Sequence, residues 1–516
     1  MADRWASLPI VCKGGLDLSV DKLTLGTNEP GAATILQNYE PSIAGGYARI
    51  QGYSKWDSTV VPGTTNAPVL GVGAALGGVF GVRHSTVTTS NDIYFSSGSG
   101  WTKINTSTRG GTSIKARILP YVMATTAIII TDGIYYAAKW DGTTYTLING
   151  TGAPSNPKFA AYFNESIALA GYGNGNKLSL SAPVTDTDFN GADGAIEFNF
   201  GDIITGIRTF RETLYVFCTN SIYEIVLTGT TPAYQINTIT TGLGCLGQDT
   251  IQEVGGDLIY LAPDGFRSLA ATYRIGDLQL GLLSKNIQPL LLANDFTTGR
   301  SVDSYSGVHI AQKNQFRCWV YDSSVPKVST FGVVGKRIDD PINVKYEWGT
   351  LLGIQPYCAH SQYINNQEVV VIGDPTNGFV YRLENGNDFD GAAVSYMYRS
   401  PDLTFSDSTL RKVVQKLTVY TQIQGALNVI LNVQPDTQIQ NSLQPPSLTL
   451  TTMSAGALYG TAVYDTAIYG GISLPVLKLA IVGSGFLIAF QFSGTDNNPP
   501  HRIDSYTIEF GEHGRR

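Results

Sequence analysis

The segment from Asp186 to Glu197 has the residue types and spacing of a calcium-binding loop. It reads Asp-Thr-Asp-Phe-Asn-Gly-Ala-Asp-Gly-Ala-Ile-Glu, so Asp186, Asp188, Asn190 and Glu197 occupy ligand positions of the helix-loop-helix calcium motif. That motif also needs a helix on each side, whereas both flanks have the patterns of strands and turns. Two interpretations follow: a weak calcium-site candidate, or an Asx-rich loop between strands, which the flanks favour.

A second motif, Gly242-Leu-Gly-Cys-Leu-Gly247, matches the G-x-G-x-x-G fingerprint of dinucleotide-binding proteins. In those proteins the last glycine opens a helix whose N-terminus faces the pyrophosphate. Here the following residues, Thr250 to Val254, have the pattern of a strand. The motif is therefore interpreted as a glycine-rich turn between repeats, and no cofactor is expected.

The sequence contains none of the common catalytic motifs. It has no G-x-S-x-G, no H-E-x-x-H and no zinc-deaminase pattern, and its five histidines are widely scattered. We therefore predict no enzymatic activity and no catalytic residues. Two carboxylates on separate loops could still meet as in glycosidases, so a glycosidase stays an alternative that spacing cannot exclude. The histidines are His84, His309, His360, His501 and His513.

Cysteine usage and the apolar segments predict synthesis in the cytoplasm without export. The five cysteines are an odd number without C-x-x-C spacing, which argues against a disulfide framework and a zinc site. The N-terminus lacks the pattern of a secretory signal. The most apolar stretch, 70–82, is shorter than the roughly 20 residues that span a bilayer, so no membrane-spanning segment is expected.

A strand-turn-strand unit recurs between residues 80 and 390. Two clear copies are 212–226 and 257–269, in which an apolar strand, a small polar or Asp-Gly turn and a second strand follow one another. Recurrence at about 30 to 57 residues approaches the period of a propeller blade, so we predict an all-β protein with a β-propeller of six or seven blades. The predicted strand nuclei are 92–95, 133–136, 165–169, 214–217, 258–261, 316–320 and 369–372.

Composition agrees with this fold and argues against one class of function. Only 15% of the residues are charged, whereas 57 are Gly and 28 are Tyr, as expected for strands separated by tight turns. The formal net charge is −7, and no run of Lys and Arg exceeds two residues. Sequence-specific nucleic-acid binding is therefore not expected.

The patterns divide the chain into three parts. Residues 1–60 read as an N-terminal extended arm with a blade-closing strand, residues 61–390 as the propeller, and residues 391–516 as a C-terminal β-sandwich with longer, strictly alternating strands. A short helix is predicted at 284–291. The segment 458–471 spaces tyrosines every five residues and reads as an exposed or subunit-facing loop, or as turns folded onto the sandwich.

Three segments together resemble the tail nozzle, or packaged-DNA stabilisation, proteins of short-tailed bacteriophages. They are Asn38-Tyr-Glu-Pro41 with Gly45-Gly-Tyr-Ala-Arg-Ile-Gln-Gly-Tyr53, the blade 242–269 with its Ala-Pro-Asp-Gly-Phe-Arg turn, and the end Asn498-Pro-Pro-His-Arg-Ile-Asp-Ser-Tyr-Thr-Ile-Glu-Phe510. The resemblance implies a structural virion protein located in the phage tail. In such proteins, subunits associate in a ring of six copies that retains the DNA genome and then passes it.

The resemblance also implies partners: the adaptor or portal ring, a tail fibre or tailspike, and genomic DNA touched non-specifically in the lumen. Because a basic lumen would hold DNA by counterion release, the acidic net charge suggests a lining along which DNA slides. The alternative function is a propeller-type receptor-binding or glycan-binding tail protein that uses its loops and exposed tyrosines.

Overall fold

Strands dominate the computed structural model, which describes residues 5–85, 87, 89–110, 114–229, 233–269, 281–297, 300–326, 329–339, 344–437, 439, 442–452 and 476–513. The α-helices of this part are short, and none of its helices is long and apolar enough to cross a membrane. The predicted all-β class and the predicted helix near 284–291 are confirmed. The helical segments are α1 (Lys22–Asn28), η1 (Gly191–Asp193), η2 (Gln248–Thr250), η3 (Lys285–Ile287), α3 (Gln288–Ala293), η4 (Val302–Ser304) and η5 (Ala311–Lys313).

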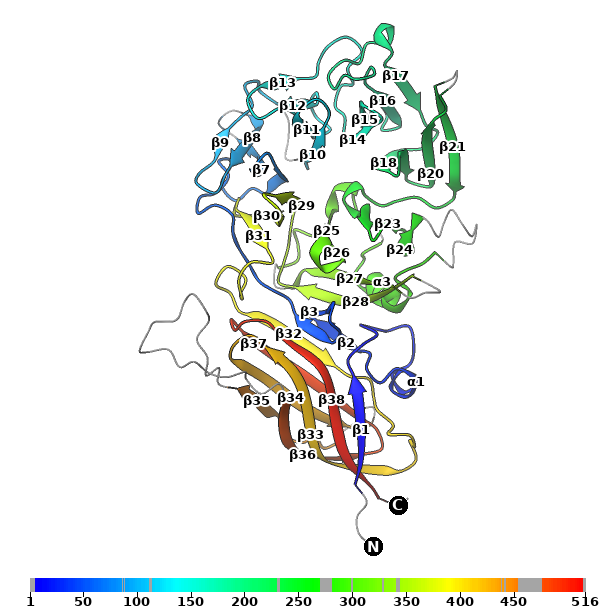
Figure 1. Cartoon of the computed structure of the whole chain (residues 1–516), viewed down its shortest axis with the longest axis vertical. Helices are drawn as coiled ribbons and strands as arrows, with labels where there is room; N and C mark the ends of the chain where they lie inside the picture. Colours follow the sequence, from blue (N-terminus) through cyan, green and yellow to red (C-terminus); the bar gives the residue numbers. More distant parts are fainter. Residues whose placement is uncertain are drawn as a thin grey trace.

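Seven antiparallel blades of three or four strands form a closed ring within the described residues; six are separate sheets, and β25–β28 belong to a larger sheet of nine strands (Figure 1). The first strand of each sheet lies innermost and contacts the first strand of the next sheet or the turn η2 that precedes it. This arrangement is a β-propeller, as predicted from the repeated hairpins, and it has seven blades, the larger of the two predicted numbers. The first four blades contain β6 (Val69–Ala75), β7 (Gly78–Ser85), β8 (Ser90–Ser96), β9 (Thr102–Lys103); β10 (Arg117–Val122), β11 (Thr126–Thr131), β12 (Ala138–Trp140), β13 (Tyr145–Leu147); β14 (Phe159–Phe163), β15 (Ser166–Tyr172), β16 (Lys177–Leu180), β17 (Ile196–Asn199); and β18 (Ile204–Phe210), β19 (Thr213–Cys218), β20 (Ser221–Leu227), β21 (Tyr234–Thr241). The last three contain β22 (Gln252–Val254), β23 (Asp257–Ala262), β24 (Gly265–Ser268); β25 (Tyr305–Ile310), β26 (Gln315–Val320), β27 (Phe331–Asp339), β28 (Val344–Leu352); and β29 (Cys358–Ile364), β30 (Gln367–Gly373), β31 (Val380–Leu383), β5 (Tyr53–Lys55).

The ring is closed by a strand from the N-terminal arm. β5 pairs antiparallel with β31, so that Tyr53 lies opposite Leu383 and Lys55 opposite Tyr381. The Tyr53 ring also stacks on Phe389 with ring centroids 5.1 Å apart. The seventh blade therefore combines strands that are more than 300 residues apart in the sequence.

One predicted strand nucleus is wrong. Residues 133–136 form a bend between β11 and β12 rather than a strand. Asp132 causes this, because its Oδ1 accepts hydrogen bonds from the backbone amides of Ile134 and Tyr135, and Gly133 has a φ of 69°. The other six nuclei lie on strands β8, β15, β19, β23, β26 and β30.

The C-terminal part is a β-sandwich, as predicted, and one of its layers continues into the propeller (Figure 1). Strand β2 pairs in parallel with β28 of the sixth blade and antiparallel with β32 of the sandwich, which creates one nine-stranded sheet. The second layer has the order β3-β4-β38-β33-β36, with β1 also paired to β38. Outside the blades, the strands are β1 (Ala6–Val11), β2 (Ile35–Gln37), β3 (Tyr39–Pro41), β4 (Tyr47–Arg49), β32 (Val394–Arg399), β33 (Arg411–Ile423), β34 (Leu427–Pro435), β35 (Leu448–Thr452), β36 (Val476–Gly485), β37 (Ile488–Asp496) and β38 (His501–His513).

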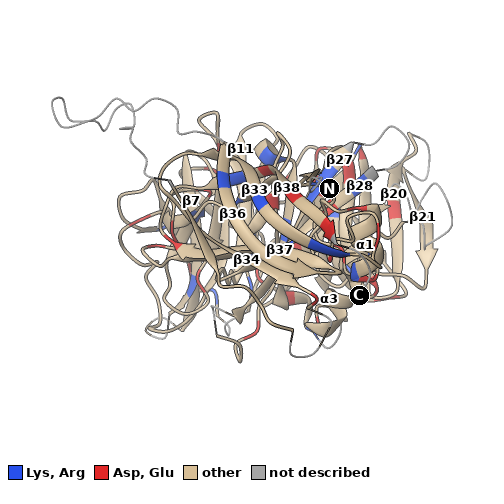
Figure 2. Ribbon diagram, turned by 90° about the horizontal axis from the view of Figure 1, so that it is seen from below, with Lys and Arg blue, Asp and Glu red and all other residues tan. Residues whose placement is uncertain are grey.

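A single apolar core runs from the fifth and sixth blades into the sandwich. It includes Phe266 and Trp348 of the blades, Tyr47 of the arm, and Phe492 and Tyr506 of the sandwich. Because the core and one sheet are continuous, hydrogen bonds and apolar contacts join the propeller to the sandwich. Acidic and basic residues are interspersed over the ribbon (Figure 2). The predicted tyrosine loop at 458–471 lies outside the described residues.

Candidate functional site

Within the described residues, polar side chains gather both at the joint between propeller and sandwich and at the centre of the propeller. At the joint, Asn38 is buried with a φ of 50°, a conformation that asparagine tolerates. Its Nδ2 donates to the carbonyls of Leu352 (3.0 Å) and Ser395 (2.7 Å), and its Oδ1 accepts from the Leu352 amide (2.8 Å). One side chain therefore links the end of β28 to β32.

Arg49 makes a second link at the joint. Its buried guanidinium donates to the carbonyls of Asn387 (2.7 Å), Asp496 (3.2 Å) and Asn498 (3.1 Å). Asn387 follows the seventh blade, whereas Asp496 ends strand β37 of the sandwich and Asn498 lies between β37 and β38. Arg49 therefore ties together segments from both halves of the molecule.

A network of four charges lies beside these links, with Glu40 and Arg317 buried and Lys313 and Glu384 partly exposed. Glu40 of β3 pairs with Arg317 of β26 at 2.7 Å and with Lys313 at 2.5 Å, and Arg317 also pairs with Glu384 at 2.6 Å. Burial raises the pKa of Glu384, but Arg317 and Lys313 outweigh burial and hold this pKa below its usual value. The charges of the two carboxylates and the two cations cancel. The network is therefore ionised and links the arm to the propeller.

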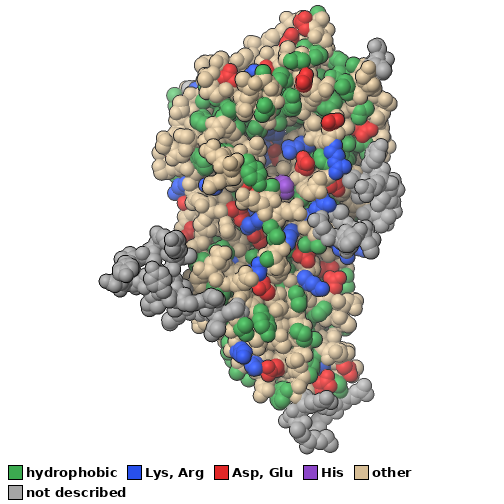
Figure 3. All heavy atoms as spheres, in the orientation of Figure 1, with side chains coloured by type: hydrophobic (Ala, Val, Ile, Leu, Met, Phe, Trp, Pro, Cys, Tyr) green, Lys and Arg blue, Asp and Glu red, His purple; other side chains and the backbone are tan. Residues whose placement is uncertain are grey.

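The centre of the propeller contains a cavity of about 550 Å³, which is lined by residues from all seven blades. Figure 3 shows its mouth as a hollow in the middle of the disc, with basic side chains and a histidine nearby. A cavity of this size lies in the range of small-molecule sites, roughly 300 to 1,000 Å³.

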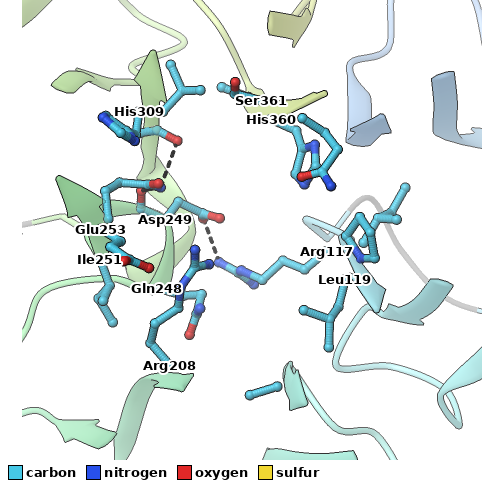
Figure 4. Close-up of a pocket in the computed structure, with 18 of the residues that line it drawn as sticks. Arg117, Leu119, Arg208, Gln248, Asp249, Ile251, Glu253, His309, His360 and Ser361 are labelled. Atoms are coloured by element: carbon cyan, nitrogen blue, oxygen red, sulfur yellow. Dashed lines mark hydrogen bonds and ion pairs between the residues drawn. The ribbon is translucent and has the colours of Figure 1, made fainter. Parts of the chain in front are cut away.

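One wall of the cavity carries charges that neutralise one another. The Asp249 carboxylate pairs with Arg117 at 3.0 Å (Figure 4). It also pairs with Lys115 at 3.0 Å, and Arg117 pairs with Asp303 at 2.8 Å. Burial raises the pKa of Asp249, but the two cations outweigh burial and hold it low. This wall therefore presents no free charge.

The other polar side chains of the cavity make fewer hydrogen bonds and ion pairs. Arg208 of β18 extends into it (Figure 4) and has no hydrogen-bond or ion-pair partner in the described chain. His309 Nε2 is likewise buried without a partner there. His360 Nδ1 accepts a hydrogen bond of 3.2 Å from the Ala74 amide. Burial, with Arg208 as a second cause, lowers the pKa of His360 to about 4, so the ring is neutral at pH 7.

A glycosidase would have its paired carboxylates in a cavity of this kind. Of its lining acids, Asp249 is ion-paired, and Glu368 accepts from the amides of Ala311 (2.6 Å) and Gln312 (2.9 Å) and from Ser361 Oγ (3.0 Å). The third lining acid, Glu253, is exposed and has no hydrogen-bond or ion-pair partner in the described residues. The cavity thus lacks a pair of unengaged carboxylates within that part of the chain.

The residues of the calcium-loop candidate have separate partners. Asp186 accepts from Tyr121 Oη (2.6 Å) and Lys139 Nζ (2.5 Å), and Asp188 accepts from the Asn190 amide (2.9 Å). Glu197 lies on β17, where it accepts from Tyr172 Oη (2.8 Å) and pairs with the Lys177 ammonium. No group of three His, Cys, Asp or Glu side chains in the described residues is placed to hold a metal ion.

The glycine motif connects two blades. Gly242 follows β21 of the fourth blade, and Gly247 precedes the three-residue turn η2 and strand β22 of the fifth. Gly244 is packed so closely that a Cβ would lie 2.2 Å from the carbonyl oxygens of Cys218 and Thr219. These glycines therefore allow the chain to cross between blades.

All five cysteines are buried as free thiols.

Sequence reasoning missed the cavity residues. His309 and His360 are 51 positions apart in the sequence but lie on the adjacent inner strands β25 and β29. The available signal was the blade repeat itself, because polar residues in the first strand of each blade converge at the axis of a propeller.

The fold and these sites define a β-propeller protein with a fused sandwich. No protein-family model and no curated protein sequence matches the chain. Among solved structures it is similar, at 10% identity and a TM-score of 0.39, to an extracellular domain assigned to a one-component system of Bacteroides thetaiotaomicron, over 65% of this chain and 40% of that one.

Two further structures are similar to a comparable degree. They are the Pan2 WD40 domain of Neurospora crassa, with 10% identity, a TM-score of 0.33 and coverage of 66% of this chain and 97% of that one, and an auxiliary nutrient binding protein of B. thetaiotaomicron, with 10% identity, a TM-score of 0.34 and coverage of 74% and 76%.

Proposed function

We propose that this chain is a structural virion protein, a tail nozzle subunit of a short-tailed phage. Copies of it would form a ring-shaped conduit that retains the DNA genome and then passes it. One observation carries the proposal: the segments that resemble the nozzle family build the joint that makes the propeller and the sandwich one body.

The arm segment and the terminal segment meet directly. Tyr39 Oη and His501 Nε2 are hydrogen-bonded at 2.7 Å, and Arg49 donates to the Asn498 carbonyl. Gly46 packs against the terminal strand so closely that a Cβ would lie 2.5 Å from the Ile503 carbonyl oxygen. The residues of the resemblance therefore hold the arm against the terminal segment, which supports the proposal.

The blade segment reaches the same joint. In its Pro-Asp-Gly-Phe-Arg turn, Arg267 Nε donates to Asp264 at 2.9 Å. Phe266 stacks on Trp348, with ring centroids 5.3 Å apart, in the core that the arm and the sandwich share. A subunit of a conduit must transmit load between its neighbours without bending, and this joint supports that task.

The proposal is tested by electron microscopy of purified particles and of the isolated protein. The expected result is an axial ring below the portal or adaptor, and a soluble assembly with six times the chain mass of 55.4 kDa when the adaptor is present. The tail fibre or tailspike should contact the same ring. Finding the chain as fibres or as capsid decoration would overturn the proposal.

A second candidate, a receptor-binding or glycan-binding tail protein, is favoured by the polar cavity at the propeller axis. A structural ring needs no unpaired Arg208 there, whereas a binding protein does. The test is adhesion of the isolated protein to host cells. Adhesion without ring formation would favour this candidate over the nozzle, and a ring without adhesion would exclude it.

A further inference from the structure

Four polar side chains in the propeller cavity retain binding capacity within the described part of the chain. Arg208 and Glu253 have no hydrogen-bond or ion-pair partner there, His309 Nε2 is buried without a partner, and His360 Nε2 makes no hydrogen bond there. They come from four blades, on strands β18, β22, β25 and β29. Their convergence at one cavity defines a site that is separate from the joint between propeller and sandwich.

Arg208 sets the charge of the ligand. The other cations of the cavity, Lys115 and Arg117, are already paired with Asp249 and Asp303, whereas the Arg208 guanidinium makes no hydrogen bond or ion pair in the described chain. Burial lowers the pKa of Arg208, and the charge of the nearby Glu253 carboxylate raises it. A guanidinium keeps its charge at neutral pH, and its planar fork matches the two oxygens of a carboxylate. The cavity therefore has a position for one carboxylate.

The other three side chains, Glu253, His309 and His360, favour hydroxyl groups on the ligand. Because His360 Nδ1 accepts from the Ala74 amide, the proton of the neutral ring must be on Nε2, which is then a donor. His309 adds a second imidazole, whose buried Nε2 has no partner in the described residues, and the Glu253 carboxylate can only accept. Hydroxyl groups both donate and accept, so they satisfy all three side chains.

We propose that the propeller cavity binds a hydroxylated carboxylate, an acidic sugar unit, with its carboxylate on Arg208 and its hydroxyls on Glu253, His309 and His360. A neutral sugar would leave the Arg208 guanidinium without a hydrogen-bonded carboxylate. Inorganic phosphate would bring two charges near Glu253 and Glu368, and a simple carboxylate would leave Glu253 without a donor. This site deepens the second candidate function and is compatible with a nozzle subunit.

The test is isothermal titration of the full chain with glucuronate, with glucose, acetate and inorganic phosphate as comparators. We expect saturable binding of one glucuronate per chain, at least tenfold tighter than any comparator. Absence of glucuronate binding, or equal binding of phosphate or glucose, would overturn the proposal.

Variants locate the site. Arg208→Gln removes an unpaired cation, so folding should be retained, and glucuronate affinity should fall at least tenfold. His360→Asn keeps an acceptor for the Ala74 amide but loses the Nε2 donor, and should weaken binding severalfold. Arg411→Gln, an exposed arginine of the sandwich strand β33, is the matched control and should bind like the parent.

Circular dichroism melting checks that each variant is folded. Binding that survives Arg208→Gln in a folded protein would contradict the assignment. Ring formation and cell adhesion of Arg208→Gln are measured in parallel. If glucuronate binding is absent but adhesion persists, the cavity proposal fails while the second candidate function stands.

Discussion

Glu40 of the N-terminal arm and Arg317 of the sixth blade are 277 positions apart in the sequence and form a buried ion pair of 2.7 Å. Their side chains are 5% and 1% exposed. Glu40→Gln would leave Arg317 and Lys313 facing Glu384 alone, so we expect a loss of about 3 to 5 kcal/mol of unfolding free energy, measured by urea denaturation.

The control for this substitution is Glu509→Gln, which removes an ion pair of 2.8 Å with Lys416 on the sandwich surface. Both partners are more than a third exposed, so this loss should stay below about 1 kcal/mol. Equal losses for the two variants would show that the joint does not depend on the buried pair.

Acid should weaken the joint through His501. Burial, assisted by Arg49, lowers the pKa of His501 to about 3, whereas the unfolded residue titrates near 6.5. Between these values the unfolded chain binds the extra proton, so stability falls as the pH falls, by up to about 1.4 kcal/mol per pH unit. His501→Gln keeps a polar atom near Tyr39 and should flatten the pH dependence of unfolding between pH 6.5 and 4. An unchanged slope would assign acid lability to other groups.

Adjacent glycines of the arm offer a matched pair of substitutions. Gly45 and Gly46 both have positive φ, 87° and 74°, but a Cβ at Gly45 meets no atom within 4 Å. Gly45→Ala should cost only about 1 to 2 kcal/mol of backbone strain. Gly46→Ala adds a clash with the Ile503 carbonyl of β38 and should cost about 1 to 3 kcal/mol more, measured by thermal melting. Equal costs would mean that the arm can move away from β38.

The five thiols should be unreactive in the folded protein. All are buried, and burial raises the pKa of each, for example to about 11 at Cys245 and to about 12 at Cys12. Because the thiolate is the reactive form, Ellman's reagent should titrate no cysteine at pH 8 and five after denaturation. Rapid labelling of the folded protein would show that a blade opens locally.

Much of the strand pattern could be predicted, because alternation and turn residues act over short distances. The hairpins at 212–226 and 257–269 and the long strands of the sandwich follow these local rules. The bend at 133–136 does not, since the Asp132 side chain competes for the backbone amides that a strand would use.

The long-range features had no local signal. Insertion of β2 between β28 and β32 depends on residues that are distant in the sequence, as does pairing of β5 with β31. The same limit applies to sites. The spacing from Asp186 to Glu197 matched a calcium loop, but the partners of Asp186 are Tyr121 and Lys139, and the cavity residues converge only once the ring closes.

Closure of the ring by β5 constrains the order of events during synthesis. Residues 53–55 leave the ribosome early, but their partner strand β31 is made only at residues 380–383. Strand β1 similarly waits for β38, at residues 501–513. Such distant pairings slow folding, and unpaired strand edges invite association with other chains. The nascent protein therefore carries open edges through most of its translation, and we expect its yield to depend on protection of those edges until both closures form.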